Sequence, residues 1–168
     1  MRYLVLFAVS LLLLSPGSGS YAQMASSTSG IDGNKKPEKI PTHVAAFAWF
    51  NRAANNMNDA QRPYRFEQDL GNTGVSEADQ GALKGIVSNF YEAYAKLRAA
   101  YNANVSRGEV TYIETRAYNN AKYQLALDAL AQTKQQMSPD GAKRFAAHIE
   151  AFKRSVSMSP GTGSELSQ

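Results

Sequence analysis

Cysteine is absent from the 168 residues of this chain. Its absence excludes a disulfide framework, thiolate metal sites, a cysteine nucleophile and a lipidated N-terminal cysteine. Histidine is scarce as well: His43 and His148 are the only two, and neither belongs to a His-x3-His or Glu-x2-His pair. Because a helical metal centre without cysteine needs such spacing, we expect no metal site and no cofactor.

Sequence patterns typical of catalytic loops are also missing. The chain has no Gly-x-Ser-x-Gly turn after a strand and no glycine-rich phosphate loop. Its carboxylates are scattered along segments with helical periodicity, where most are expected to face solvent. We therefore expect a non-catalytic protein and assign no catalytic residue.

No large excess of charge of one sign is present. The chain has 18 basic and 14 acidic residues, a formal net charge of +4, and the two signs are interspersed outside the segment 35–39. Because no basic helix face emerges that could follow a phosphate backbone, we expect no nucleic-acid partner.

The only long apolar run lies at the N-terminus. Residues 4–14 are apolar apart from one serine, they follow Arg2, and small residues precede a cleavage point between Ala22 and Gln23. As a helix this run would reach only about 16 Å, roughly half of a hydrocarbon core. We interpret residues 1–22 as a signal peptide. The mature chain is then exported, periplasmic or extracellular, and has no transmembrane segment.

Both ends of the mature chain have little apolar content. Residues 23–40 are rich in serine, glycine, asparagine and lysine, and residues 157–168 have a similar composition. Such segments bury too little apolar area to offset the entropy of ordering. We therefore predict a flexible leader over 23–40, a disordered tail over 157–168 and a folded domain over 41–156.

Within that domain, apolar residues recur at steps of three and four, the spacing of one helix face. The clearest run is Leu83, Ile86, Val87, Phe90, Tyr94, Leu97 and Tyr101. The segment 42–58 is apolar almost all round, so we expect other helices to surround it. Phe90 and Phe152 are predicted core residues.

Helix-start signals divide the domain into elements. Ser76 and Thr111 each precede a carboxylate by three positions, and Ser138 precedes a proline at a first helical position. Together with the periodicity, these signals predict helices over 42–58, 76–104, 111–137 and 139–156, and a short helix over 64–70. We expect an all-α fold, either a four-helix bundle or a long antiparallel helical hairpin with two shorter helices packed on it.

Tyrosine is more frequent than in an average protein. Of nine tyrosines, six lie on the two long predicted helices. A tyrosine side chain combines an apolar ring with a polar tip, which suits half-buried positions and contact surfaces. One interpretation places Tyr94 and Tyr101 in the seam of the hairpin. The alternative is a binding face that contains Tyr91, Tyr118 and Arg98.

Two of the helix starts carry a family resemblance. The chain reads Val-Ser-Glu-Ala-Asp over 75–79 and Met-Ser-Pro-Asp-Gly over 137–141. These segments resemble the paired Leu-Thr-x-x-Gln motif of the Spy/CpxP-like periplasmic proteins, with Val75 and Met137 in place of Leu, and Asp79 and Gly141 in place of Gln. The resemblance implies a helical cradle, usually a homodimer, that holds unfolded client proteins on its concave face. It identifies no individual site residue.

Three hypotheses about function follow. The first is an exported, non-catalytic helical protein that binds another protein or peptide, in a chaperone-like manner or otherwise. The second is a structural or assembly component of the cell envelope. The third, a small-ligand binder or an enzyme, requires a polar pocket between the helices predicted over 42–58 and 111–137.

Overall fold

The computed structural model describes residues 30–108 and 110–159, so the predicted signal peptide lies outside the described residues. The fold is all-α, as predicted. Five α-helices account for most of it: α1 (Thr42–Met57), α2 (Tyr64–Gly71), α3 (Glu77–Ser106), α4 (Tyr112–Gln136) and α5 (Pro139–Phe152). Four short elements flank them: β1 (Ile31–Asp32), η1 (Pro37–Lys39), η2 (Lys153–Ser155) and β2 (Ser157–Met158). None of the helices described is long and apolar enough to span a bilayer.

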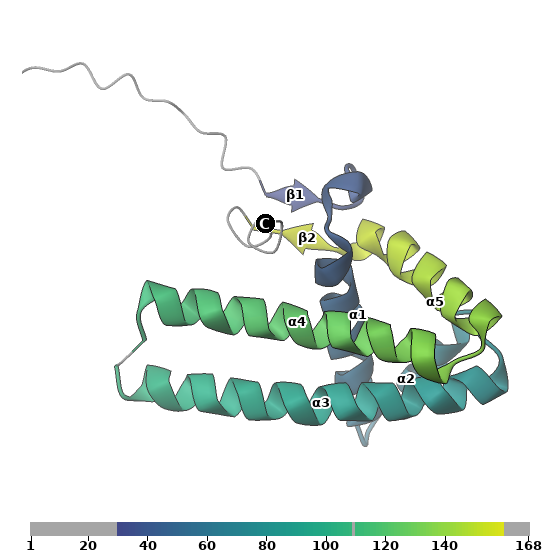
Figure 1. Cartoon of the computed structure of the whole chain (residues 1–168), viewed down its shortest axis with the longest axis horizontal. Helices are drawn as coiled ribbons and strands as arrows, with labels where there is room; N and C mark the ends of the chain where they lie inside the picture. The colour runs from purple at the N-terminus through teal and green to yellow at the C-terminus, as the bar shows by residue number, and fades with distance from the viewer. Residues whose placement is uncertain (1–29, 109, 160–168) are drawn as a thin grey trace, which may run out of the picture.

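The two long helices, α3 and α4, lie side by side and antiparallel (Figure 1). Gly108 follows the last turn of α3 with a φ of 71°, a left-handed conformation that glycine adopts without steric cost. A capping box then starts α4. The Thr111 backbone N–H donates to Glu114 Oε2 over 2.7 Å, and the Glu114 N–H donates to Thr111 Oγ1 over 3.2 Å. The helical hairpin predicted from the sequence is therefore confirmed.

Helix α1 crosses one face of the hairpin and forms the centre of the core (Figure 1). Trp49 and Phe50 on α1 are fully buried. The Trp49 ring packs edge-on against Phe145 of α5 at a centroid distance of 4.8 Å, and the Phe50 ring lies 5.4 Å from that of Phe90 on α3. The prediction of Phe90 as a core residue is confirmed. Phe152, which was also predicted to be a core residue, is only half-buried and packs at the margin of the core.

One carboxylate joins the starts of α3 and α5. Asp79 accepts a hydrogen bond from Ser76 Oγ over 2.7 Å, from the Ser138 N–H over 2.7 Å and from Ser138 Oγ over 2.8 Å. These hydrogen bonds, first among them the one from the Ser138 backbone, hold the pKa of Asp79 below its ordinary value. A Cβ at Gly141 would overlap this carboxylate, so a larger residue there would displace Asp79 from its present position. The two segments 75–79 and 137–141 therefore meet in space.

The two ends of the described chain pair with each other, which corrects the predicted boundaries at 41 and 156. Strand β1 is antiparallel to β2, with Ile31 opposite Met158, and the Gly33 N–H donates to the Val156 carbonyl over 2.9 Å. Ile40, within the leader predicted to be flexible, is 1% exposed. The packed unit thus includes residues 30–40 and 157–159, whereas 23–29 and 160–168 lie outside the described residues.

These two segments are ordered although each alone has too little apolar content to offset the entropy of ordering. Paired with each other, the two ends share backbone hydrogen bonds and bury apolar side chains that neither could bury by itself. Glycine allows this close approach, since a Cβ at Gly33 would overlap the carbonyl oxygens of Lys153 and Val156. Helix α5 ends at Phe152, earlier than the predicted residue 156, and η2 follows it directly.

Candidate functional site

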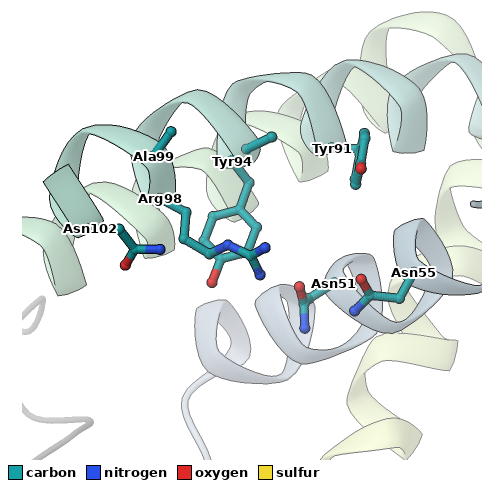
Figure 2. A pocket seen from close by; sticks show the side chains of 8 residues that line it. Asn51, Asn55, Tyr91, Tyr94, Arg98, Ala99 and Asn102 are labelled. Atoms are coloured by element: carbon teal, nitrogen blue, oxygen red, sulfur yellow. The ribbon is translucent and has the colours of Figure 1, made fainter.

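A polar pocket lies between α1 and α3, and we call it the α1–α3 pocket (Figure 2). Its volume is about 240 Å³, and its lining residues are Asn51, Asn55, Tyr91, Tyr94, Ala95, Arg98, Ala99 and Asn102. The first two are one helical turn apart on α1, and the others recur at steps of three and four on α3. Packing of the two helices therefore brings two polar stripes together.

The lining of the α1–α3 pocket includes one cation and no carboxylate. Figure 2 shows the Arg98 side chain reaching from α3 towards the side chain of Asn51 on α1. Over residues 30–108 and 110–159, Arg98 makes no ion pair, and the side-chain amides of Asn51, Asn55 and Asn102 make no hydrogen bond. These groups are available to a ligand.

Of the three predicted binding residues, Tyr91 and Arg98 share this pocket and Tyr118 does not. Tyr118 is half-buried in the seam between α3 and α4, where its ring stacks on Tyr101 at a centroid distance of 4.2 Å. Its hydroxyl shares a hydrogen bond with the Tyr94 hydroxyl over 3.3 Å. Burial, with a smaller effect of that hydrogen bond, raises the pKa of Tyr118 above its ordinary range. Tyr118 therefore supports the pocket from behind, through Tyr94.

The seam interpretation holds for the two other tyrosines. Tyr94 contacts Tyr118 of α4, and the Tyr101 hydroxyl lies 3.1 Å from Thr115 Oγ1 on the same helix. Tyr94 also packs edge-on against the Phe47 ring of α1 at 5.2 Å. It thus belongs both to the seam and to the wall of the α1–α3 pocket.

A larger and more apolar groove lies between α4 and α5, and we call it the α4–α5 groove. Its volume is about 620 Å³. It is lined by Thr42, Leu127, Leu130, Ala131, Thr133, Lys134, Gln135, Ala142, Ala146, Ala147, Ile149 and Glu150. Figure 1 shows that α4 and α5 meet at the short connection between them and diverge from there.

Charged side chains mark one margin of the α4–α5 groove. Glu150 accepts a hydrogen bond from Thr42 Oγ1 over 2.7 Å and forms an ion pair with Lys153 over 2.7 Å. Burial raises the pKa of Glu150, but the hydrogen bonds from Lys153 and Thr42 outweigh it, so the pKa is lowered. Lys134 lies in the lining without an ion pair in the part of the chain that the structure describes.

Sequence reasoning missed this groove. The signal was present as leucines and alanines at helical spacing on both segments, but such a stripe is interpreted as core when the partner helix is unknown. Only the diverging course of α4 and α5 leaves part of the stripe uncovered: Leu127 and Leu130 are half-buried, and Ala146 is exposed.

The end of the hairpin is apolar and exposed. Val105, Tyr112 and Ile113 are exposed by 48%, 75% and 77%. Ile113 therefore does not belong to the buried face of α4. Helix α1 crosses the hairpin too far from this end to cover it (Figure 1).

Both histidines are half-buried side chains of the core margin. The Nε2 atoms of His43 and His148 have no hydrogen-bond partner, and burial lowers the pKa of each. His43 packs edge-on against the Tyr123 ring at 5.1 Å. Over residues 30–108 and 110–159, no group of three or more histidine, aspartate or glutamate side chains is placed to hold a metal ion.

The polar pocket required by the third hypothesis is not where it was expected. The predicted helices over 42–58 and 111–137 correspond to α1 and α4, which meet through aromatic contacts: the Phe47 and Tyr123 rings lie 5.8 Å apart, and the Lys122 ammonium of α4 lies 5.4 Å from the Phe47 centroid. Polar groups converge between α1 and α3 instead.

Comparison with known proteins adds no assignment to this geometry. No family model matches the chain, and no curated protein or solved structure matches it. The resemblance to the Spy/CpxP-like proteins therefore stays a prediction from two short segments, and the function must be argued from the sites themselves.

Proposed function

We propose that this chain is an exported, non-catalytic protein whose α4–α5 groove binds a helical segment of another protein. The observation that carries the proposal is the groove itself, an apolar depression of about 620 Å³ along two diverging helices. An amphipathic helix binds such a groove through apolar side chains spaced at three and four residues.

The residues of the groove suit a helix better than a compact ligand. Ala131, Ala142, Ala146 and Ala147 are small, so a partner backbone can approach closely. Leu127 and Leu130 provide the apolar contacts at the side of α4, and the charged side chains of Lys134 and Glu150 in the lining would fix the orientation of the partner. The lining covers about two turns of each helix, residues 127–135 of α4 and 142–150 of α5.

Export rests on the N-terminal segment. Residues 1–22 have the charge, apolar run and small residues of a signal peptide, and a chain without cysteine is compatible with an oxidising compartment. The absence of catalytic sequence motifs supports a binding role, because the loops that would build an active site are short.

Cross-linking at the groove tests the proposal. A photo-reactive amino acid is placed at Ala146 in the groove and, as a control, at Ala103, an exposed position of α3 that lines neither the α4–α5 groove nor the α1–α3 pocket. We expect covalent adducts from position 146 and few from position 103. Equal adduct formation at the two positions would contradict the proposal.

The identity of the adducts separates the hypotheses. A single stoichiometric partner favours an assembly component of the envelope. Many partners, together with suppression of the aggregation of an unfolded client by the purified protein, favour chaperone-like binding. An adduct with a second copy of this chain identifies a homodimer.

A further inference from the structure

We infer that the α1–α3 pocket is a separate binding site for a carboxylate on a short apolar stem. The observation that points to it is the guanidinium of Arg98, which lies in the pocket without an ion pair over residues 30–108 and 110–159. Three other cations of the fold are paired by contrast: Arg52 with Asp69, Lys84 with Glu67 and Arg144 with Asp140.

The groups around Arg98 favour an anion. A guanidinium carries only hydrogen-bond donors and stays charged at every physiological pH. The side-chain amides of Asn51 and Asn102 and the Tyr91 hydroxyl add further donors, and none of the lining residues is acidic. A cation would meet the positive charge of Arg98 with nothing to balance it, so the pocket excludes cationic ligands.

The charge of the pocket selects a carboxylate over a phosphate. One guanidinium balances one negative charge, and its planar fork matches the two oxygens of a carboxylate. No lysine, second arginine or helix N-terminus lines the pocket, so a phosphate dianion would keep an uncompensated charge. The ligand is therefore a monoanion with a planar head.

The other side of the pocket suits a carbon chain. Ala95 and Ala99 form an apolar floor on α3, and the Tyr94 ring is fixed by its contacts with Phe47 and Tyr118. A volume of about 240 Å³ is below the usual range of about 300–1,000 Å³ for drug-sized ligands. It fits a short organic acid or the C-terminal residue of a peptide, which share the same chemistry.

A nuclear magnetic resonance titration of the 15N-labelled mature chain, 23–168, tests the inference. The probe is hexanoate, its neutral control is hexanamide, and the signals followed are the Arg98 Nε–H and the Asn51 and Asn102 side-chain amides. We expect saturable shifts with hexanoate and none with hexanamide. Equal shifts with the two compounds, or tighter binding of inorganic phosphate than of hexanoate, would overturn the inference.

Two matched variants locate the site. Arg98→Gln should weaken hexanoate binding about tenfold or more, because it removes a charged hydrogen-bonding group. Lys96→Gln lowers the net charge equally on an exposed position of the same helix and should leave binding unchanged. If both variants weaken binding to the same extent, the binding is a diffuse effect of charge and the inference is wrong.

A peptide arm identifies the source of the carboxylate. A tripeptide ending in leucine with a free carboxylate is compared with its C-terminal amide and with hexanoate. Tighter binding of the free peptide than of hexanoate assigns the site to peptide C-termini, and equal or weaker binding assigns it to free organic acids. Ala146→Leu, which obstructs the α4–α5 groove, should change none of these titrations. The experiment therefore tests the carboxylate site separately from the proposed function of the groove.

Discussion

Gly33 and Gly85 should respond in opposite ways to the same substitution by alanine. Gly33 is buried where β1 passes the turn before β2, and a Cβ there would overlap the carbonyl oxygens of Lys153 and Val156. Gly85 lies inside α3, where a Cβ has no neighbour within 4 Å. The comparison therefore tests the pairing of the two chain ends against a matched control.

The expected magnitudes follow from the contacts. Gly33→Ala should break the hydrogen bond from its N–H to Val156, a loss of about 0.5–1.5 kcal/mol, and should partly expose Met158, whose full burial contributes about 1.5–3 kcal/mol. The freed ends regain conformational entropy, so we expect a net loss of about 1–3 kcal/mol, typical of overpacking. Gly85→Ala should stabilise the protein by about 0.5–1 kcal/mol.

Urea unfolding followed by circular dichroism measures both changes. With a slope of about 1–3 kcal/mol per molar urea, Gly33→Ala should lower the midpoint by on the order of 1 M, and Gly85→Ala should raise it slightly. If Gly33→Ala unfolds at the wild-type midpoint while Gly85→Ala behaves as expected, the ends do not pair in solution and the argument is refuted.

Three further predictions concern the core, the ends and pH. Phe90→Ala should lower the free energy of unfolding by about 3–5 kcal/mol. Phe152→Ala should lower it less, because Phe152 is only half-buried; the same urea titration measures both changes. Limited proteolysis followed by mass spectrometry should leave a fragment of about 30–159, and a fragment of 41–156 would show that the ends open readily. Acid should destabilise the protein in two stages, since the pKa values of both histidines and of Asp79 are lowered in the folded state. The contribution of the histidines is complete above their unfolded pKa of about 6.5 and falls as the pH decreases below it, and that of Asp79 falls below its ordinary value of 3.8. A free energy of unfolding that stays constant from pH 7 to pH 4 would contradict the first stage.

The helices could be predicted from the sequence because their signals are local. The stripe that contains Phe90 and the capping box at Thr111 each depend on residues within a few positions. The structure places those helices within a few residues of the predicted bounds. The pairing of Ile31 with Met158 could not be predicted in this way, because it joins segments at opposite ends of the domain that carry no periodic pattern.

The candidate sites were predicted only in part for the same reason. Tyr91 and Arg98 lie seven residues apart on one helix, so their shared face follows from helical spacing. The contribution of Asn51 and the burial of Tyr118 in the seam depend on how α1 and α4 pack against α3. The α4–α5 groove depends on the divergence of two helices, which their apolar stripes do not encode individually.

The affinity of a cross-linked partner for two variants, each with one alanine replaced by leucine, tests the central claim most directly. Calorimetry would compare Ala146→Leu, which adds bulk inside the α4–α5 groove, with Ala103→Leu, which makes the same change on an exposed position outside it. Circular dichroism would first confirm that both variants fold. We predict that Ala146→Leu weakens binding by about tenfold, on the order of 1.4 kcal/mol, and that Ala103→Leu binds like the wild type. Wild-type affinity in Ala146→Leu would contradict the claim that the groove is the binding site.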